Sequence, residues 1–223
     1  MLRQACSPTH GNSEDLMAID INGSSHHGNT LKTGTSQMNA SLQNRYGSIA
    51  QSLHWVTAIL VLAAFVLGPG GSEQSVYSAS RDFERQLHQT LGMLVFGLTF
   101  LRLFWKLVDR PPASEPMPDW MEKTSKLVQG ALYFLLLAVP ATAIAGAWLE
   151  GHTVNLLAGL QFAPPIGLSH SLGATIANIH TLLADAMIWI AAAHAFAATY
   201  HHFILKDGVL VSMLARWFPL PRR

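Results

Sequence analysis

Long apolar runs alternate with polar stretches along the part of the chain that follows residue 44. The runs cover roughly residues 49–68, 87–108, 127–149 and 174–202. Each has about the 20 residues that an α-helix needs to cross the hydrocarbon core of a bilayer. The first run ends in Gly-Pro-Gly-Gly, which breaks a helix, and Pro140 inside the third run predicts a kink. The pattern therefore predicts a bundle of four membrane-spanning helices.

The composition supports an all-α membrane protein. Of the 223 residues, 50% are hydrophobic and 12% are charged, which is about half of the charged share of a soluble domain. The formal net charge is +1, and no basic tract is interleaved with aromatic residues, so no nucleic-acid partner is expected. Cys6 is the single cysteine, which excludes an intrachain disulfide, a cysteine-ligated iron–sulfur cluster and thioether attachment of haem.

Residues 1–44 differ from the rest of the chain. They are rich in Ser, Asn, Gly and Thr without a period, which predicts a disordered polar tail, and they lack the basic and apolar regions of a secretory signal. Initiation at Met38 would give a more compact protein. We expect a four-helix membrane domain at residues 45–215 and a short basic tail at 216–223.

Lysine and arginine residues predict the orientation of the bundle. One side carries Arg45, Arg102, Lys106, Arg110, Lys123, Lys126, Lys206, Arg216, Arg222 and Arg223. The other side carries only Arg81 and Arg85, offset by neighbouring acidic residues. The positive-inside rule then places both termini in the cytoplasm, as four spans allow.

Four histidines lie in or at the edge of the predicted spans: His54, His88, His180 and His194. An ionisable ring in hydrocarbon is costly and normally faces the bundle interior with a partner. His180 and His194 are fourteen residues apart, so they lie about 40° from the same face of one helix and about 21 Å apart along its axis. The predicted topology puts His54 at the depth of His194, and His88 at the depth of His180.

This depth matching predicts two pairs of histidines, each holding the iron of one haem between two imidazoles. Iron with two imidazole ligands favours electron transfer over oxygen binding. Because His54 and His88 lie near span ends, each could instead hydrogen-bond to a lipid headgroup or a backbone carbonyl. Gly92 and the alanines around His194 would let a porphyrin approach the helices, or serve close helix packing.

Several motifs occur in the order found in the bacterial cytochrome b561 family: LHW at 53–55, LHQTLG at 87–92, LRLFWKL at 101–107 and HTLLADAMIWIAAAHAFAATYHHFILKDGVL from residue 180. Residues 44–215 resemble this family, whereas the long polar tail has no counterpart in it. The resemblance implies a four-helix bundle in a bacterial inner membrane with two b haems, axial ligands at the four histidines named above, and electron exchange with the quinone pool.

Further polar residues lie at the predicted cytoplasmic end of the spans. His201 and His202 are candidates for binding a quinone head group, exchanging its proton or contacting a haem propionate; alternatively they are a hydrated interfacial pair. Arg102 and Lys106 are candidates for neutralising propionates, but they would also serve as positive-inside anchors. Arg45 is likewise a candidate for either of these two roles.

On the predicted outer side, Arg81 and Arg85 could pair with the propionates of the outer haem or attract an anionic reactant, although a solvated loop is also consistent with them. His152 and His170 have no helical spacing, and we do not expect them to ligate. Asp185 lies inside the fourth span, where an isolated carboxylate is costly. It is a candidate for a proton path or for a bond to a neighbouring helix.

We therefore predict a dihaem b-type cytochrome, a quinone-linked oxidoreductase that moves electrons between a ubiquinone-type quinone and a reactant on the periplasmic side. That reactant is a redox protein or a small molecule such as superoxide. The first alternative is a cytochrome b membrane anchor of a larger dehydrogenase or hydrogenase. The second is a four-span transporter or structural protein with buried polar histidines.

Overall fold

The structure is a computed structural model that describes residues 45–109, 117–157, 159–165 and 169–214. Four long helices dominate these ranges: α2 (Ser48–Val66), α4 (Asp82–Val108), α5 (Asp119–Leu149) and α6 (His170–Tyr200). All four are long and apolar enough to cross a membrane, as the sequence predicts. The predicted tail at residues 1–44 and the tail at 216–223 lie outside the described residues.

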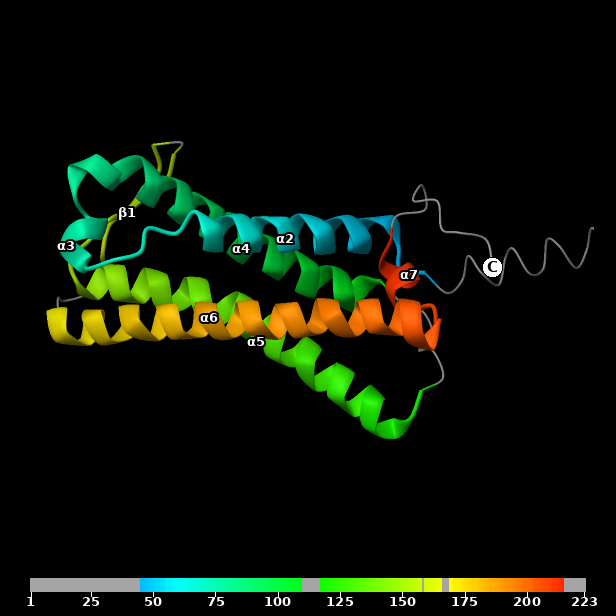
Figure 1. Cartoon of the computed structure of the whole chain (residues 1–223). Helices are drawn as coiled ribbons and strands as arrows, with labels where there is room; N and C mark the ends of the chain where they lie inside the picture. The colour runs from blue at the N-terminus through cyan, green and yellow to red at the C-terminus, as the bar shows by residue number, and fades with distance from the viewer. Residues whose placement is uncertain (1–44, 110–116, 158, 166–168, 215–223) are drawn as a thin grey trace, which may run out of the picture. The chain divides into compact units, whose positions relative to one another are not determined.

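Shorter elements lie at the two ends of the bundle (Figure 1). The helix α3 (Glu73–Val76), the 3₁₀ turn η1 (Ala79–Arg81) and the antiparallel strands β1 (Val154–Asn155) and β2 (Gln161–Phe162) share one end, which we call the loop end. The π-helical turn η2 (His201–Leu205) and the helix α7 (Val209–Met213) lie at the other end, which we call the terminal end. The sequence did not predict the hairpin, because strands of two residues leave no readable alternation.

The long helices begin before the apolar runs do, α2 by one residue and the other three by four to eight. For example, α5 begins at Asp119 rather than near residue 127, and α4 at Asp82 rather than near residue 87. Both have two acidic residues in the first turn, where negative charge interacts favourably with the helix dipole. Polar first turns extend these helices beyond the apolar stretch that hydropathy detects.

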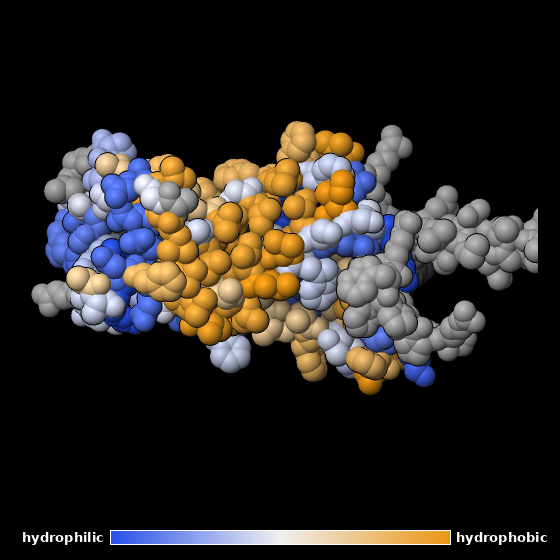
Figure 2. Space-filling model, turned by 90° about the horizontal axis from the view of Figure 1, so that it is seen from above, coloured by the Kyte–Doolittle hydropathy of each residue, from blue (hydrophilic) through white to orange (hydrophobic). Residues whose placement is uncertain are grey.

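The buried core lies between α4, α5 and α6, and it consists of Val95, Leu135, Leu136, Val139 and Met187. Most other large apolar side chains face outward; Trp189, for example, is 77% exposed. Figure 2 shows this apolar surface over the middle of the bundle and hydrophilic residues at the loop end. An exposed apolar belt is what a bilayer would cover.

The helix α5 continues through Pro140, which is buried inside it. In Figure 1 the first part of α5 diverges from the bundle, whereas its second part runs beside α6. A proline removes one backbone hydrogen bond and bends a helix, which agrees with the kink predicted from the sequence.

Candidate functional site

The rings of His88 on α4 and His180 on α6 lie close together near the loop end, with 6.2 Å between their centroids and 86° between their planes. His88 Nδ1 lies 2.8 Å from the carbonyl oxygen of Ala64, and His180 Nδ1 lies 2.9 Å from that of Val139. Because a carbonyl only accepts, each Nδ1 carries the proton and donates it. Both Nε2 atoms are therefore left with free lone pairs, the tautomer that a metal-binding histidine uses.

We call His88 and His180 the loop-end pair. The distance between their rings fits one metal ion, because two metal–nitrogen bonds of about 2 Å and two ring radii add up to a similar length. Gly68 follows the end of α2 and is also close to this pair: a Cβ atom there would lie 3.3 Å from His88 Nδ1. The residues present thus fit a bis-imidazole metal centre.

His54 on α2 and His194 on α6, the terminal-end pair, lie within electrostatic reach of each other and of Arg102 on α4. Arg102 Nη2 lies 3.2 Å from His54 Nδ1. Since a guanidinium only donates, Nδ1 of His54 accepts here, opposite to the loop-end pair. Ligation through Nε2 of His54 requires the proton to move to Nδ1 and Arg102 to turn away.

Arg102 belongs to a cationic group at the terminal end. Its guanidinium carbon lies 5.3 Å from the centroid of the Tyr133 ring, and Lys106 Nζ lies 5.1 Å from the same centroid. Within the described residues neither cation forms an ion pair. Both charges therefore remain available to a carboxylate ligand such as a haem propionate. The sequence indicates both cations as site candidates, but it does not indicate Tyr133, whose ring contacts them by cation–π interactions.

The two adjacent histidines of η2 have different surroundings. His201 Nδ1 lies 2.5 Å from an oxygen of Asp207, which also accepts a hydrogen bond from the backbone of Val209. Nδ1 of His202 is buried and has no hydrogen-bond partner among the described residues. Although π-helical turns are rare in proteins, those that occur are often found at functional sites. Of these two histidines, His202 is thus the one whose Nδ1 atom is buried and unpartnered within the described residues, while Nδ1 of His201 is held by Asp207.

The two arginines predicted on the outer side are engaged by neighbouring groups. Arg81 donates to Glu84, with 3.0 Å between Nε and Oε2, and to the carbonyl oxygen of Gly70. Arg85 is 8% exposed and pairs with Asp82, while its Nε atom is buried without a partner. Arg85 is thus part of the packed loop end rather than of a solvated loop, and one of its donors is still free.

Asp185 lies on the outer face of α6. Its side chain is exposed, as are those of Leu182 and Trp189 on the same face, and none of the described residues makes a hydrogen bond or ion pair with it. The position is about 140° around the helix from His180. Asp185 therefore does not belong to either histidine pair.

The sequence also missed the partners of the loop-end pair. Val139 and Ala64 contribute backbone carbonyls, which no residue type signals, and they come from helices other than those of the histidines. The sequence predicts only a helix break at Gly68. Its contact with His88 became visible only in the packed bundle.

Comparison with known proteins identifies the class of protein to which this chain belongs. Residues 45–216 match the family model described as prokaryotic cytochrome b561. Cytochrome b561 homolog 1 of Escherichia coli is 31% identical over 174 residues, covering 78% of this chain and 98% of that protein. Cytochrome b562 of Cereibacter sphaeroides is 29% identical over 175 residues, covering 76% and 94%.

A further relative, from Yersinia pestis, is named probable superoxide oxidase CybB; it is 24% identical over 185 residues, covering 78% of this chain and 98% of that protein. With its four apolar helices, the chain is a multi-pass membrane cytochrome. It belongs to the prokaryotic cytochrome b561 family, as the sequence motifs predicted. Membership in a cytochrome b family implies bound haem.

Proposed function

We propose that this protein is a dihaem b-type cytochrome that transfers electrons between a ubiquinone-type quinone at the terminal end and a one-electron reactant at the loop end. The observation that carries the proposal is the loop-end pair, whose two Nδ1 atoms donate to backbone carbonyls. The helix α6 contributes one histidine to each pair, so it would link the two centres.

The four histidines would hold the two haems. When bound, each haem supplies one-electron redox chemistry at its iron. The chain orients the imidazoles: the hydrogen bonds from Nδ1 of His88 and His180 fix both rings and raise the basicity of their Nε2 atoms. Two imidazole ligands leave no open coordination position, which favours electron transfer.

At the terminal end, side chains of the chain would serve the quinone. Reduction of one quinone to quinol takes up two electrons and two protons, so the site needs a group that exchanges protons. His202 has a buried Nδ1 atom without a partner among the described residues, and Asp207 orients the neighbouring His201. Arg102 and Lys106 would neutralise the carboxylates of the nearer haem.

At the loop end, we propose superoxide as the reactant, since a relative is named probable superoxide oxidase. Two superoxide anions each lose one electron and become dioxygen, and one quinone takes up these electrons with two protons. The spare donor of Arg85 lies at this end and would favour an anion. We further propose that both termini face the cytoplasm, which places the loop end on the periplasmic side.

The purified protein is expected to contain two haems per chain and to show a b-type α band in the reduced-minus-oxidised spectrum. Superoxide generated in solution should reduce the haems, and added ubiquinone should then be converted to quinol with re-oxidation of the haems. The reverse reaction, from quinol to a set of acceptors, tests the direction of flow. A spectrum without an α band would contradict the proposal, and haem reduction by quinol but not by superoxide would exclude superoxide as the reactant.

Replacing Arg102 with glutamine is expected to lower the midpoint potential of one haem by roughly 60 mV, about 1.4 kcal/mol for one electron. The reason is that a positive charge near His54 and His194 favours the reduced, more electron-rich centre. A redox titration followed in the α band would measure the shift. Arg102→Lys keeps the charge and is the control. Equal shifts of both haems, or the same shift in the lysine variant, would contradict a local charge effect.

A further inference from the structure

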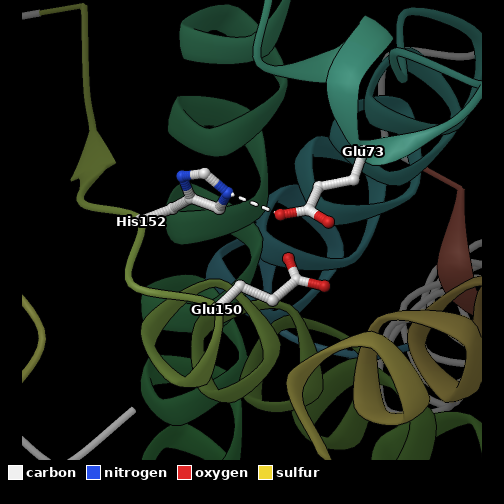
Figure 3. Close-up of side chains that lie close together, drawn as sticks. All are labelled: Glu73, Glu150 and His152. Carbon is white, nitrogen blue, oxygen red and sulfur yellow. Dashed lines mark hydrogen bonds and ion pairs between the residues drawn. The ribbon is translucent and has the colours of Figure 1, made fainter. Parts of the chain in front are cut away.

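Four side chains with metal-ligating atoms meet at the loop end, outside both histidine pairs. Glu73 begins α3, Glu150 caps the end of α5, His152 follows it in the loop, and His170 begins α6. We call these four residues the Glu/His cluster. Figure 3 shows Glu73, Glu150 and His152 pointing toward one another from separate segments. The fold thus joins residues that are far apart in the sequence.

Three of the four residues of the cluster have ligand atoms close enough to share one ion, and His170 lies beside them. His152 Nε2 lies 3.0 Å from Glu73 Oε1, and His170 Nε2 lies 3.5 Å from Glu73 Oε2. One ligand atom from each of Glu73, Glu150 and His152 lies within 4.8 Å of the others. Together with Tyr77, both histidines and Glu73 line a cavity of about 440 Å³. A small cation has room beside these atoms.

The cluster carries negative charge that is incompletely compensated. Within the described residues, no hydrogen bond or ion pair engages the carboxylate of Glu150. Two carboxylates held this close together without a cation repel each other, so a bound dication would stabilise the arrangement.

Surrounding residues hold the ligands in place. The Tyr77 ring stacks on His152 with 3.4 Å between centroids and 15° between planes. The guanidinium carbon of Arg85 lies 5.1 Å from the centroid of the same Tyr77 ring. The start of α6 packs closely against Glu150, because a Cβ atom on Gly173 would lie 2.6 Å from Glu150 Cγ. An outer layer that orients ligands is characteristic of metal sites.

We propose that the Glu/His cluster binds a first-row transition-metal dication such as Zn²⁺. Imidazole nitrogens together with carboxylate oxygens suit zinc and its neighbours, whereas Ca²⁺ and Mg²⁺ prefer ligand sets made of oxygen alone. The bound ion would tie together α3, the end of α5 and the start of α6. This inference rests on the loop-end geometry and does not depend on the proposed electron-transfer reaction.

The test is calorimetric titration of ZnSO₄ into the purified, haem-loaded, full-length protein, stripped of other metals and free of an affinity tag. We expect one Zn²⁺ per chain at this site and a higher midpoint of thermal unfolding with Zn²⁺ present, because an ion that binds only the folded state stabilises it. Glu73→Gln and His170→Asn should each weaken Zn²⁺ binding by at least about 10-fold. His170 is 69% exposed, so its replacement tests the site even if the Glu73 variant folds poorly.

Two controls separate this site from other binders. Glu84→Gln removes a carboxylate at the same end that pairs with Arg81 outside the cluster, and it should leave Zn²⁺ affinity unchanged. The double variant His26→Asn/His27→Asn tests the N-terminal histidines and should also have no effect. Absence of Zn²⁺ binding, binding lost only in the His26/His27 variant, equal affinity in His170→Asn, or equally tight binding of Mg²⁺ would each overturn the proposal.

Discussion

Replacement of His180 with alanine is expected to lower the haem content from two per chain to one. In the proposed arrangement His180 ligates only the haem at the loop end, while His54 and His194 hold the other. The two histidines of α6 are about 21 Å apart along the helix axis, so loss of one centre leaves the other intact. The haem-to-protein ratio measures this, and a redox titration should show one component instead of two.

The complementary variant is His194→Ala, which should retain the loop-end haem and lose the other. Thr181→Ala is a matched control, because Thr181 is next to His180, is exposed, and bonds only to its own helix. It should keep both haems. Loss of both haems from His180→Ala while the helical content is unchanged would contradict the pairing, as would retention of both.

Replacement of Gly173 with alanine is expected to destabilise the protein by about 1–3 kcal/mol. The new Cβ atom would lie 2.8 Å from the backbone nitrogen of Glu150 and 3.1 Å from the carbonyl oxygen of Gly146. Backbone atoms cannot move aside as a flexible side chain does, so α5 and α6 would have to separate. Thermal unfolding in detergent, followed by helical circular dichroism, measures the loss.

Gly130→Ala is the control for this variant. A Cβ atom at Gly130 would meet nothing within 4 Å, and alanine favours a helix over glycine by about 1 kcal/mol. This control should therefore be neutral or slightly stabilising in the same measurement. If Gly173→Ala unfolds at the same temperature as Gly130→Ala, the close contact between α5 and α6 at Gly173 does not contribute to stability.

Helix number and the family could be predicted because both depend on local patterns. An apolar run of sufficient length predicts a span whatever surrounds it, and fourteen residues between His180 and His194 place both on one face of a helix by geometry alone. The positions predicted for the helix starts were less accurate. The polar first turn of α5 at Asp119 carries no hydropathy signal, although it is favourable for the helix dipole.

Contacts between helices could not be predicted, because they join residues far apart in the chain. The carbonyl of Ala64 selects the tautomer of His88, which is 24 residues away, and Val139 does the same for His180. Similarly, the contact between Arg102 Nη2 and His54 Nδ1 joins α4 to α2. Such partners depend on how helices are rotated and packed, which residue spacing in one helix does not specify.

The sequence by itself determined that this chain has four apolar helices with histidines at two depths, and it indicated the cytochrome b561 family. The helices and the depths of the histidines follow from the period of the α-helix and the thickness of a bilayer, whereas the family follows from the order of the motifs. Only the tertiary structure brought His152 and His170 to Glu73 and Glu150, because no residue spacing along the chain connects these four positions. The physical reason is that their convergence depends on the loops after α2 and α5 folding over one end of the bundle.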